Sequence, residues 1–306
     1  MRKRLVIASC VATLIVATPA AAMPRYGDWS EGTFLSTVNT SELEFANAIS
    51  RDELHLYFQR GDAAVGGEDL WVSHRESRSA PWGAAQKLPA TVNSAHNDRA
   101  AAISPDGHWL FFGSDRPGGR GLTDLYVSWR VDVHDDSSWQ AAVNLDDLGT
   151  PVNTAGFDSG PAIYRNDDAG TTELYFVSNP TGAQAFADVY VSVQNPDGSF
   201  GVPSAVTALS SAASEGRPYI RRDGLEIYFQ SNRVGGKGAF DIWVSTRTST
   251  DAAWSTPQNV EELNTTGVEV TPVLSWDALT LYFAVVRPGQ VGEILAAMRE
   301  RASGKP

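Results

Sequence analysis

Five acidic residues recur along the chain about every 50–60 residues, and an aliphatic residue follows each of them five positions later. The acids are Glu44, Asp98, Asp158, Glu215 and Glu269, and the aliphatic residues are Ile49, Ile103, Ile163, Ile220 and Leu274. Carboxylates crowded at one place can bind a cation or a polyol, and two opposed carboxylates are what glycoside hydrolysis requires. The chemistry of this chain therefore depends on whether the fold gathers these acids.

Each acid stands at the start of a unit with the composition of four short β-strands. A Leu/Ile-x-Phe-type strand and a Gly-rich hairpin follow the acid, and an acidic-aliphatic strand comes next. These later strands begin at Asp69-Leu70-Trp71, Asp124-Leu125-Tyr126, Asp188-Val189-Tyr190, Asp241-Ile242-Trp243 and Glu293-Ile294-Leu295. A period of this length without a helical stretch indicates a radial or stacked β array.

The outer strand of the last unit is displaced to the other end of the chain. Trp82, Trp139 and Trp254 each introduce an outer strand, Phe200 takes this place in a further copy, and the fifth copy has none. The segment 29–40 reads like 254–265, so a strand at about 28–36 would complete the last unit and remove the exposed sheet edges. The sequence predicts an all-β fold, a five-bladed β-propeller with four-stranded blades in one domain of residues 23–306.

In a propeller the first strand of each blade lines the central channel, so the five acids are expected to ring one channel mouth. The hairpin arginines, several asparagines and one histidine fall on the same face. Ligand-binding candidates on this face are Arg116, Arg233, Arg287, His96, Asn93 and Asn153, together with Arg60, Asn39 and Asn264.

Three interpretations of the acids stay open. They accept hydrogen bonds from loops and pair with arginines, they bind a cation or polyol, or two of them act as the acid and the base or nucleophile of a hydrolase. No cofactor motif is present; calcium is the cation considered, with Asp98 and Asp158 as its candidate ligands. His55, His74, His108 and His134 fall in a strand, a strand end, a turn and a loop, without metal-ligand spacing.

Blade 3 departs most from the repeat. Residues 165–170 lengthen one turn, where Asp167-Asp168 is a solvated acidic turn or a cation ligand, and residues 179–186 replace the Arg-Gly-Gly hairpin. Symmetry does not explain such departures, so a ligand pocket displaced towards blades 1 to 3 is an expectation.

Residues 1–22 have the pattern of a secretory signal peptide: a basic start, an apolar run and Ala20-x-Ala22 before the expected mature start at Met23. The run is too short to span a membrane. Ile7-Ala8-Ser9-Cys10 resembles an acylation box but lies inside the apolar run, which argues against a lipoprotein. Cleavage would remove Cys10, the sole cysteine, so we expect a periplasmic or extracellular protein without disulfides.

The acidic net charge of the chain limits the classes of partner that we expect it to bind. The chain has 24 Lys and Arg against 36 Asp and Glu, a net charge of −12, and loss of the three basic residues in 1–22 would leave −15. This charge argues against nucleic acid and anionic membranes as partners. It is compatible with a cation, a neutral sugar or a basic partner, and a monomer is expected.

The string 114–128 (SDRPGGRGLTDLYVS), repeated as 231–245 (SNRVGGKGAFDIWVS), resembles the WD40-like (TolB-type) β-propeller repeat of bacterial envelope proteins. The resemblance covers about residues 28–298. It implies a periplasmic interaction module. Together with the ring of acids, this favours a secreted or periplasmic binding or scaffold module whose acidic channel mouth engages an envelope protein, a glycan or a cation. Five-bladed rings also house arabinanases and fructosidases, so the alternative is a carbohydrate-active hydrolase, by fold analogy alone.

Overall fold

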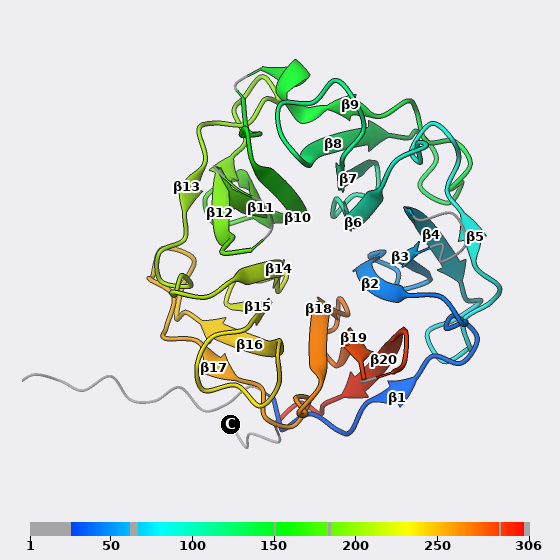
Figure 1. Ribbon diagram of the computed structural model, residues 1–306, viewed down its shortest axis with the longest axis vertical. Helices are drawn as coiled ribbons and strands as arrows, with labels where there is room; N and C mark the ends of the chain where they lie inside the picture. Colours follow the sequence, from blue (N-terminus) through cyan, green and yellow to red (C-terminus); the bar gives the residue numbers. More distant parts are fainter. Residues whose placement is uncertain are drawn as a thin grey trace, which may run out of the picture.

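Five antiparallel sheets of four strands each surround a central channel (Figure 1). The computed structural model describes residues 26–302 except 62–66, 150, 181, 183, 184 and 288. Within these residues the only helix is the 3₁₀ turn η1 (Leu145–Leu148), and none is long and apolar enough to cross a membrane. The predicted five-bladed propeller is confirmed, while the predicted signal peptide, acylation box and mature start lie outside the described residues.

The strands follow the predicted order along the chain. Blade 1 contains β2 (Glu44–Ile49), β3 (His55–Gly61), β4 (Glu68–His74) and β5 (Gln86–Lys87). Blade 2 contains β6 (Asp98–Ile103), β7 (Trp109–Ser114), β8 (Asp124–Trp129) and β9 (Val143–Asn144). Blade 3 contains β10 (Phe157–Asn166), β11 (Thr171–Asn179), β12 (Asp188–Val193) and β13 (Ser204–Ala205). Blade 4 contains β14 (Glu215–Ile220), β15 (Glu226–Ser231), β16 (Asp241–Thr246) and β17 (Gln258–Asn259). Blade 5 contains β18 (Val268–Leu274), β19 (Thr280–Val286), β20 (Gly292–Met298) and β1 (Thr33–Phe34).

The hydrophobic core lies between neighbouring blades. Leu56 and Phe58 of β3 in blade 1, for example, pack in one cluster with Tyr282 of β19 and Ile294 of β20 in blade 5. Trp82 meets the Tyr282 ring edge-on, with centroids 6.2 Å apart. The repeated aromatic residues thus hold the blades together, because each sheet buries its apolar face against the next.

The N-terminal segment closes the ring. In β1, Thr33 and Phe34 pair with Ala296 and Leu295 of β20, which lie beside them in Figure 1. The Asn39 side chain then donates to the Ile294 carbonyl at 2.9 Å and accepts from the Ile294 amide at 2.8 Å. The displaced outer strand predicted from the sequence is therefore confirmed, although it is only two residues long.

Every innermost strand (β2, β6, β10, β14 and β18) contains a register shift near its middle. In four of them the residue two positions after the acid has a left-handed φ: Ala100 (59°), Gly160 (59°), Arg217 (49°) and Thr271 (53°). Such bulges bend a strand and re-aim its side chains. They line a narrow waist in the channel, whose free volume is about 20 Å³, room for about one water molecule.

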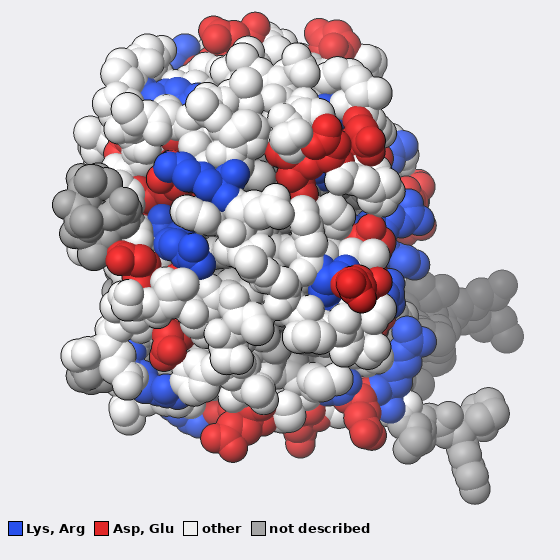
Figure 2. All heavy atoms as spheres, turned by 90° about the vertical axis from the view of Figure 1, so that its right-hand side faces the viewer, with Lys and Arg blue, Asp and Glu red and all other residues white. Residues whose placement is uncertain are grey.

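The outer wall of the ring carries mixed charges. Figure 2 shows one side, with acidic and basic side chains interspersed over it. This side has no patch made only of acidic or only of basic side chains, and the candidate sites lie in the channel.

Candidate functional site

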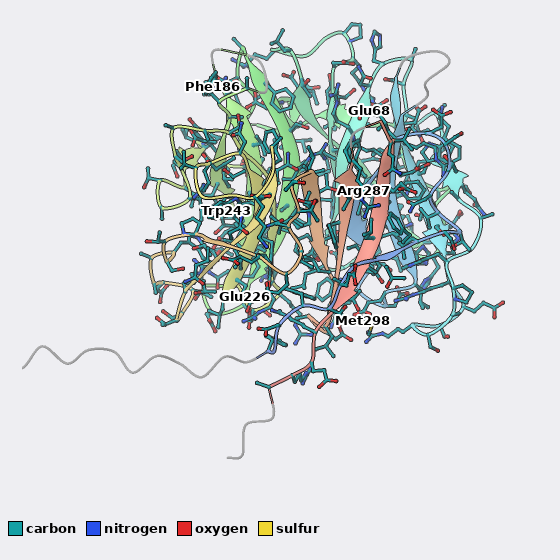
Figure 3. The ribbon with its side chains drawn as sticks, turned by 60° about the horizontal axis from the view of Figure 1, so that its bottom comes forward. Glu68, Phe186, Glu226, Trp243, Arg287 and Met298 are labelled. Carbon is teal, nitrogen blue, oxygen red and sulfur yellow. The ribbon has the colours of Figure 1, made fainter. Side chains whose placement is uncertain are left out.

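The waist divides the channel into two cavities at opposite ends of the ring. The first mouth, about 520 Å³, lies where the innermost strands begin, and the second mouth, about 330 Å³, lies where they end. Figure 3 shows the two ends, with Glu68 and Phe186 towards one and Glu226 and Met298 towards the other.

The five repeated acids lie at the beginning of the innermost strands, but each has an exposed fraction of 0%. Each carboxylate accepts hydrogen bonds from the amide and the hydroxyl of a Ser or Thr four residues earlier. These residues are Thr40, Ser94, Thr154, Ser211 and Thr265. The acids therefore fix the loop that enters each blade.

Hairpin arginines neutralise three of these carboxylates. The Arg60 guanidinium lies 2.8 Å from Glu44, that of Arg116 2.6 Å from Asp98 and that of Arg233 2.9 Å from Glu215. Each guanidinium also donates to a backbone carbonyl of the entering loop.

Blades 3 and 5 lack this ion pair. Ser178 donates to Asp158 at 2.6 Å in place of an arginine. Arg287 is exposed, and its guanidinium lies 4.9 Å from the centre of the Phe34 ring. Burial raises the pKa of Asp158 and of Glu269, and it also raises that of Glu215, although Arg233 lies beside this carboxylate.

The expected acidic mouth is corrected by this geometry. Successive side chains of a strand point to opposite sides, so the acid enters the blade and the next residue faces the channel. The residues that line the first mouth in this position are Phe45, Arg99, Ser159, Gly216 and Val270. They differ in every blade, whereas the acids are constant.

Two arginines, Arg99 and Arg217, supply the positive charge that lines the first mouth. Arg99 lies 3.2 Å from Glu68 and 3.4 Å from Asp115, so two carboxylates share it. Arg217 donates to the Gln59 side-chain oxygen at 3.0 Å and makes no ion pair with any described residue. Burial lowers the pKa of Arg217 to about 10, which reports a guanidinium held away from water without a direct counter-charge.

Unpartnered polar atoms and aromatic rings complete the first mouth. Arg99 Nε, Ser159 Oγ and Thr271 Oγ1 are buried without a hydrogen-bond partner among the described residues. Phe157 and Phe240 line the same cavity. The first mouth therefore offers a cation, hydroxyl groups and aromatic surface, the components of a sugar site.

The remaining candidates have other positions. Asn93 and Asn153 are buried, and their amides bond the backbone of Leu70 and Leu125, as Asn39 does with Ile294. Asn264 does the same with Ile242. His96 is exposed beside the first mouth's entry loops. The asparagine amides are thus used within the protein.

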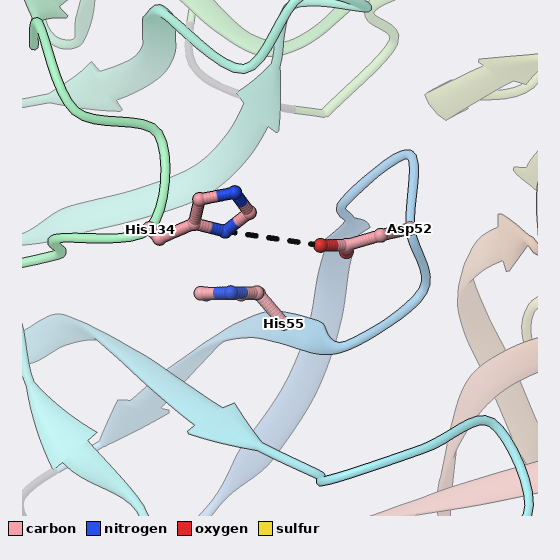
Figure 4. Close-up of side chains that lie close together, drawn as sticks. All are labelled: Asp52, His55 and His134. Carbon is pink, nitrogen blue, oxygen red and sulfur yellow. Dashed lines mark ion pairs between the residues drawn. The ribbon is translucent and has the colours of Figure 1, made fainter.

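Three of the five histidines meet at the junction of blades 1 and 2, a grouping that the sequence spacing did not indicate. His55 Nδ1 and His74 Nε2 lie 2.9 Å and 2.8 Å from the same oxygen of Asp136. Figure 4 shows His134 above His55, with its Nδ1 atom 4.0 Å from Asp52. The ligand types in these two overlapping groups are ones that a transition metal accepts.

Asp136 already has a full set of donors. Tyr57 donates to it at 2.7 Å and Arg130 at 2.6 Å, and the Arg130 side chain is 1% exposed. Burial acts to raise the pKa of Asp136, but hydrogen bonds from His55, His74 and Tyr57 and the nearby Arg130 hold it well below its usual range. A metal held by His55, His74 and Asp136 would have to displace these donors, so the geometry of that group is that of a clamp between blades.

No protein-family model and no curated protein sequence matches this chain. Solved structures share its fold. An α-L-arabinofuranosidase from Podospora anserina, in complex with cellotriose, has 12% identity and a TM-score of 0.57, with 91% of this chain and 98% of that chain covered. An endo-arabinase from Bacteroides thetaiotaomicron has 13% identity and a TM-score of 0.57, with 92% and 100% covered. A putative TolB from Agrobacterium tumefaciens has 15% identity and a TM-score of 0.48, with 82% and 72% covered. At these identities the similarity shows a propeller fold alone.

Proposed function

We propose that this protein is a secreted or periplasmic, non-catalytic binding module that takes an acidic sugar into its first mouth. The observation that carries the proposal is Arg217, whose guanidinium lies in the channel without an ion pair among the described residues. The WD40-like repeat resemblance is compatible with such a module.

A carboxylate would supply the charge that Arg217 lacks. Arginine binds carboxylates through two parallel hydrogen bonds, and such bonds are strong where water is scarce. The other cation of the mouth, Arg99, is already shared by Glu68 and Asp115. Arg217 is therefore the arginine of the first mouth that has no ion pair among the described residues, and it favours an acidic ligand.

The rest of the first mouth favours a sugar as the bearer of that carboxylate. Phe157 and Phe240 provide apolar surface for a sugar ring, and Ser159 and Thr271 provide unpartnered hydroxyl groups. The cavity of about 520 Å³ accommodates a short oligosaccharide end. That a propeller of the same fold was solved with cellotriose supports this ligand class.

A hydrolase is the alternative. The two-carboxylate mechanism needs both groups to reach the glycosidic bond. Two carboxylates line the first mouth, Glu68 and Glu215. Glu68 is bonded to Gln59 and Arg99, and Glu215 has an exposed fraction of 0% and is paired with Arg233. We therefore expect binding without turnover.

Calorimetry with a pentameric galacturonate and with xylopentaose tests the proposal. The acidic sugar should bind at least about tenfold more tightly, and Arg217→Gln should abolish the difference, because the charge is removed and the shape is largely kept. Arg222→Gln, at the opposite mouth, is the matched control and should bind normally. Equal affinity for both sugars, or a normal Arg217→Gln variant, would contradict the proposal, and release of reducing ends would favour the hydrolase.

A further inference from the structure

The second mouth has an apolar wall built from the same position of every blade. The wall residues are Ile49, Ile103, Ile163, Ile220 and Leu274, five positions after each acid, and all of them line the cavity of about 330 Å³. Four of these side chains are at most 8% exposed and pack in the core between the blades. The apolar surface open to the cavity therefore comes mainly from Ile163 and Tyr219, which are half-buried. Such a wall favours a ligand with an apolar body.

The rim of this cavity is positively charged. The residues two positions beyond the wall are Arg51, Pro105, Arg165, Arg222 and Trp276, and each of them also lines the cavity. The three arginines are exposed. Because proline and tryptophan replace arginine in the other two blades, the blade fold does not require arginine at this position.

An aspartate directly follows the rim residue in four blades (Asp52, Asp106, Asp223 and Asp277), but Asp167 is the only acidic residue among the described residues that line the cavity. Arg165 lies 3.8 Å from Asp167, a carboxylate that is 92% exposed, and such an ion pair is weak. The Arg51 guanidinium lies 5.9 Å from the centre of the Trp276 ring. Neither Arg51 nor Arg222 forms an ion pair with any described residue, so two cations are available to a ligand.

The cavity has a floor. Pro161, Pro218 and Pro272 belong to the waist of about 20 Å³ that separates the two mouths. A ligand that enters the second mouth therefore stops at the waist, with its inner part against the apolar wall and its outer part beside the arginines.

From these features we infer that the second mouth is a separate binding site for a medium-chain acyl carboxylate. The acyl chain would contact Ile163, Tyr219 and Ile220, and the carboxylate would bind Arg51 and Arg222. A volume of about 330 Å³ lies at the small end of ligand pockets, which suits a body of about ten carbons. A neutral alcohol lacks the group that the arginines bind, and an inorganic anion lacks the chain that the wall covers.

This site is independent of the proposed function, because it lies beyond the waist and uses other arginines. Calorimetry with decanoate and decanol tests it. Decanoate should bind at least about tenfold more tightly than decanol, and Arg222→Gln and Arg51→Gln should each weaken decanoate binding by about tenfold. Both arginines are exposed, so their replacement leaves the core intact. Arg217→Gln, in the first mouth, is the control and should bind decanoate normally.

A second measurement locates the chain. The fluorescence of Trp276, at the rim, should be quenched by 2-bromodecanoate, whose bromine lies beside the carboxylate, so Trp276→Phe should lose a share of the quenching that Trp129→Phe keeps. Trp129 is an exposed tryptophan that does not line this cavity. Equal binding of decanol, decanoate affinity unchanged by both rim variants, or quenching unaffected by Trp276→Phe would each overturn the inference.

Discussion

Arg217 on β14 donates to the side-chain oxygen of Gln59 on β3 at 3.0 Å, and this bond joins blade 4 to blade 1 across the channel. The same oxygen accepts the Ala100 amide of blade 2 at 2.9 Å, so three blades meet at one atom. Arg217 has a φ of 49°, a left-handed conformation that costs a non-glycine residue about 1–2 kcal/mol. The structure thus keeps a strained residue at the position where its cation enters the first mouth.

Replacing Arg217 with glycine should separate stability from binding. The lost Gln59 bond and the relieved strain are both about 1 kcal/mol, so the free energy of unfolding should change by less than about 1 kcal/mol. Acidic-sugar affinity should fall at least about tenfold. Urea denaturation and calorimetry on the same sample measure both quantities.

The control for this prediction is Ala100→Gly, at the equivalent position of blade 2 with a φ of 59°. It relieves the same strain without removing a charge, so sugar binding should be retained. A large loss of stability in Arg217→Gly would instead make the arginine a structural residue.

The fold could be predicted because its signals are local and repeated. The same order of acid, aliphatic residue, hairpin and aromatic strand recurs in each blade, and 29–40 reads like 254–265. The closing role of Asn39 follows from that similarity, because Asn264 makes the same two backbone bonds in its own blade.

The site was harder to predict because residues that recur in every blade are those that stabilise the blade fold. The constant acids bond their own loops, and the functional positions are the neighbours that vary. Arg217 did leave a signal, since Ala46, Ala100, Gly160 and Thr271 occupy the equivalent positions and only blade 4 has a long side chain there. The histidine cluster left none, because His55 and Asp136 are 81 residues apart and meet only through the packing of two blades.

Removing the charge of Asp98 should lower the free energy of unfolding more than removing the charge of Asp158. Asp98→Asn leaves Arg116 without its carboxylate and should cost about 3 kcal/mol of unfolding free energy. Asp158→Asn should cost only about 1 kcal/mol, because no guanidinium loses its counter-charge and the amide oxygen can keep the Thr154 donors, with the bond from Ser178 lost. Urea denaturation at neutral pH measures both, and equal losses would contradict the assigned role of Arg116.

The difference in stability between the wild type and Asp158→Asn should change with pH in one direction. Burial raises the pKa of Asp158 in the folded protein above its ordinary value of 3.8. The stability that this carboxyl contributes is therefore fully present below pH 3.8 and is lost as the pH rises through the folded-state pKa. Relative to the variant, the wild type should lose stability as the pH rises from about 4 to neutral, until the carboxyl is ionised in the folded protein. Paired denaturation curves across this range check it, and the opposite slope would show that the carboxylate is stabilised as an anion.

Asn39→Ala should open the ring. It removes two hydrogen bonds to Ile294 and should cost about 2 kcal/mol. Asn264→Ala removes the equivalent pair within blade 4 and is the matched control. Only Asn39→Ala should speed proteolysis of 26–40 and promote association through the edge of β20, because Asn39 fixes the terminal segment that covers this edge, whereas Asn264 fixes a loop inside a continuous stretch of chain. Equal proteolysis of both variants would argue against the closing role.

Asp136→Asn should be the most destabilising of these changes. The carboxylate binds Arg130, Tyr57 and two histidines at the junction of blades 1 and 2, and Arg130 has almost no access to water. An amide leaves that buried guanidinium without its counter-charge, which typically costs about 3–5 kcal/mol. Urea denaturation should show the loss, and the adjacent exposed Asp135→Asn should leave the transition in place. If zinc raised the melting temperature of the wild type and not that of His134→Ala, the cluster would be a metal site in addition to a clamp. A small loss in Asp136→Asn would mean that water reaches Arg130 and that the packing of hydrophobic residues alone holds the two blades.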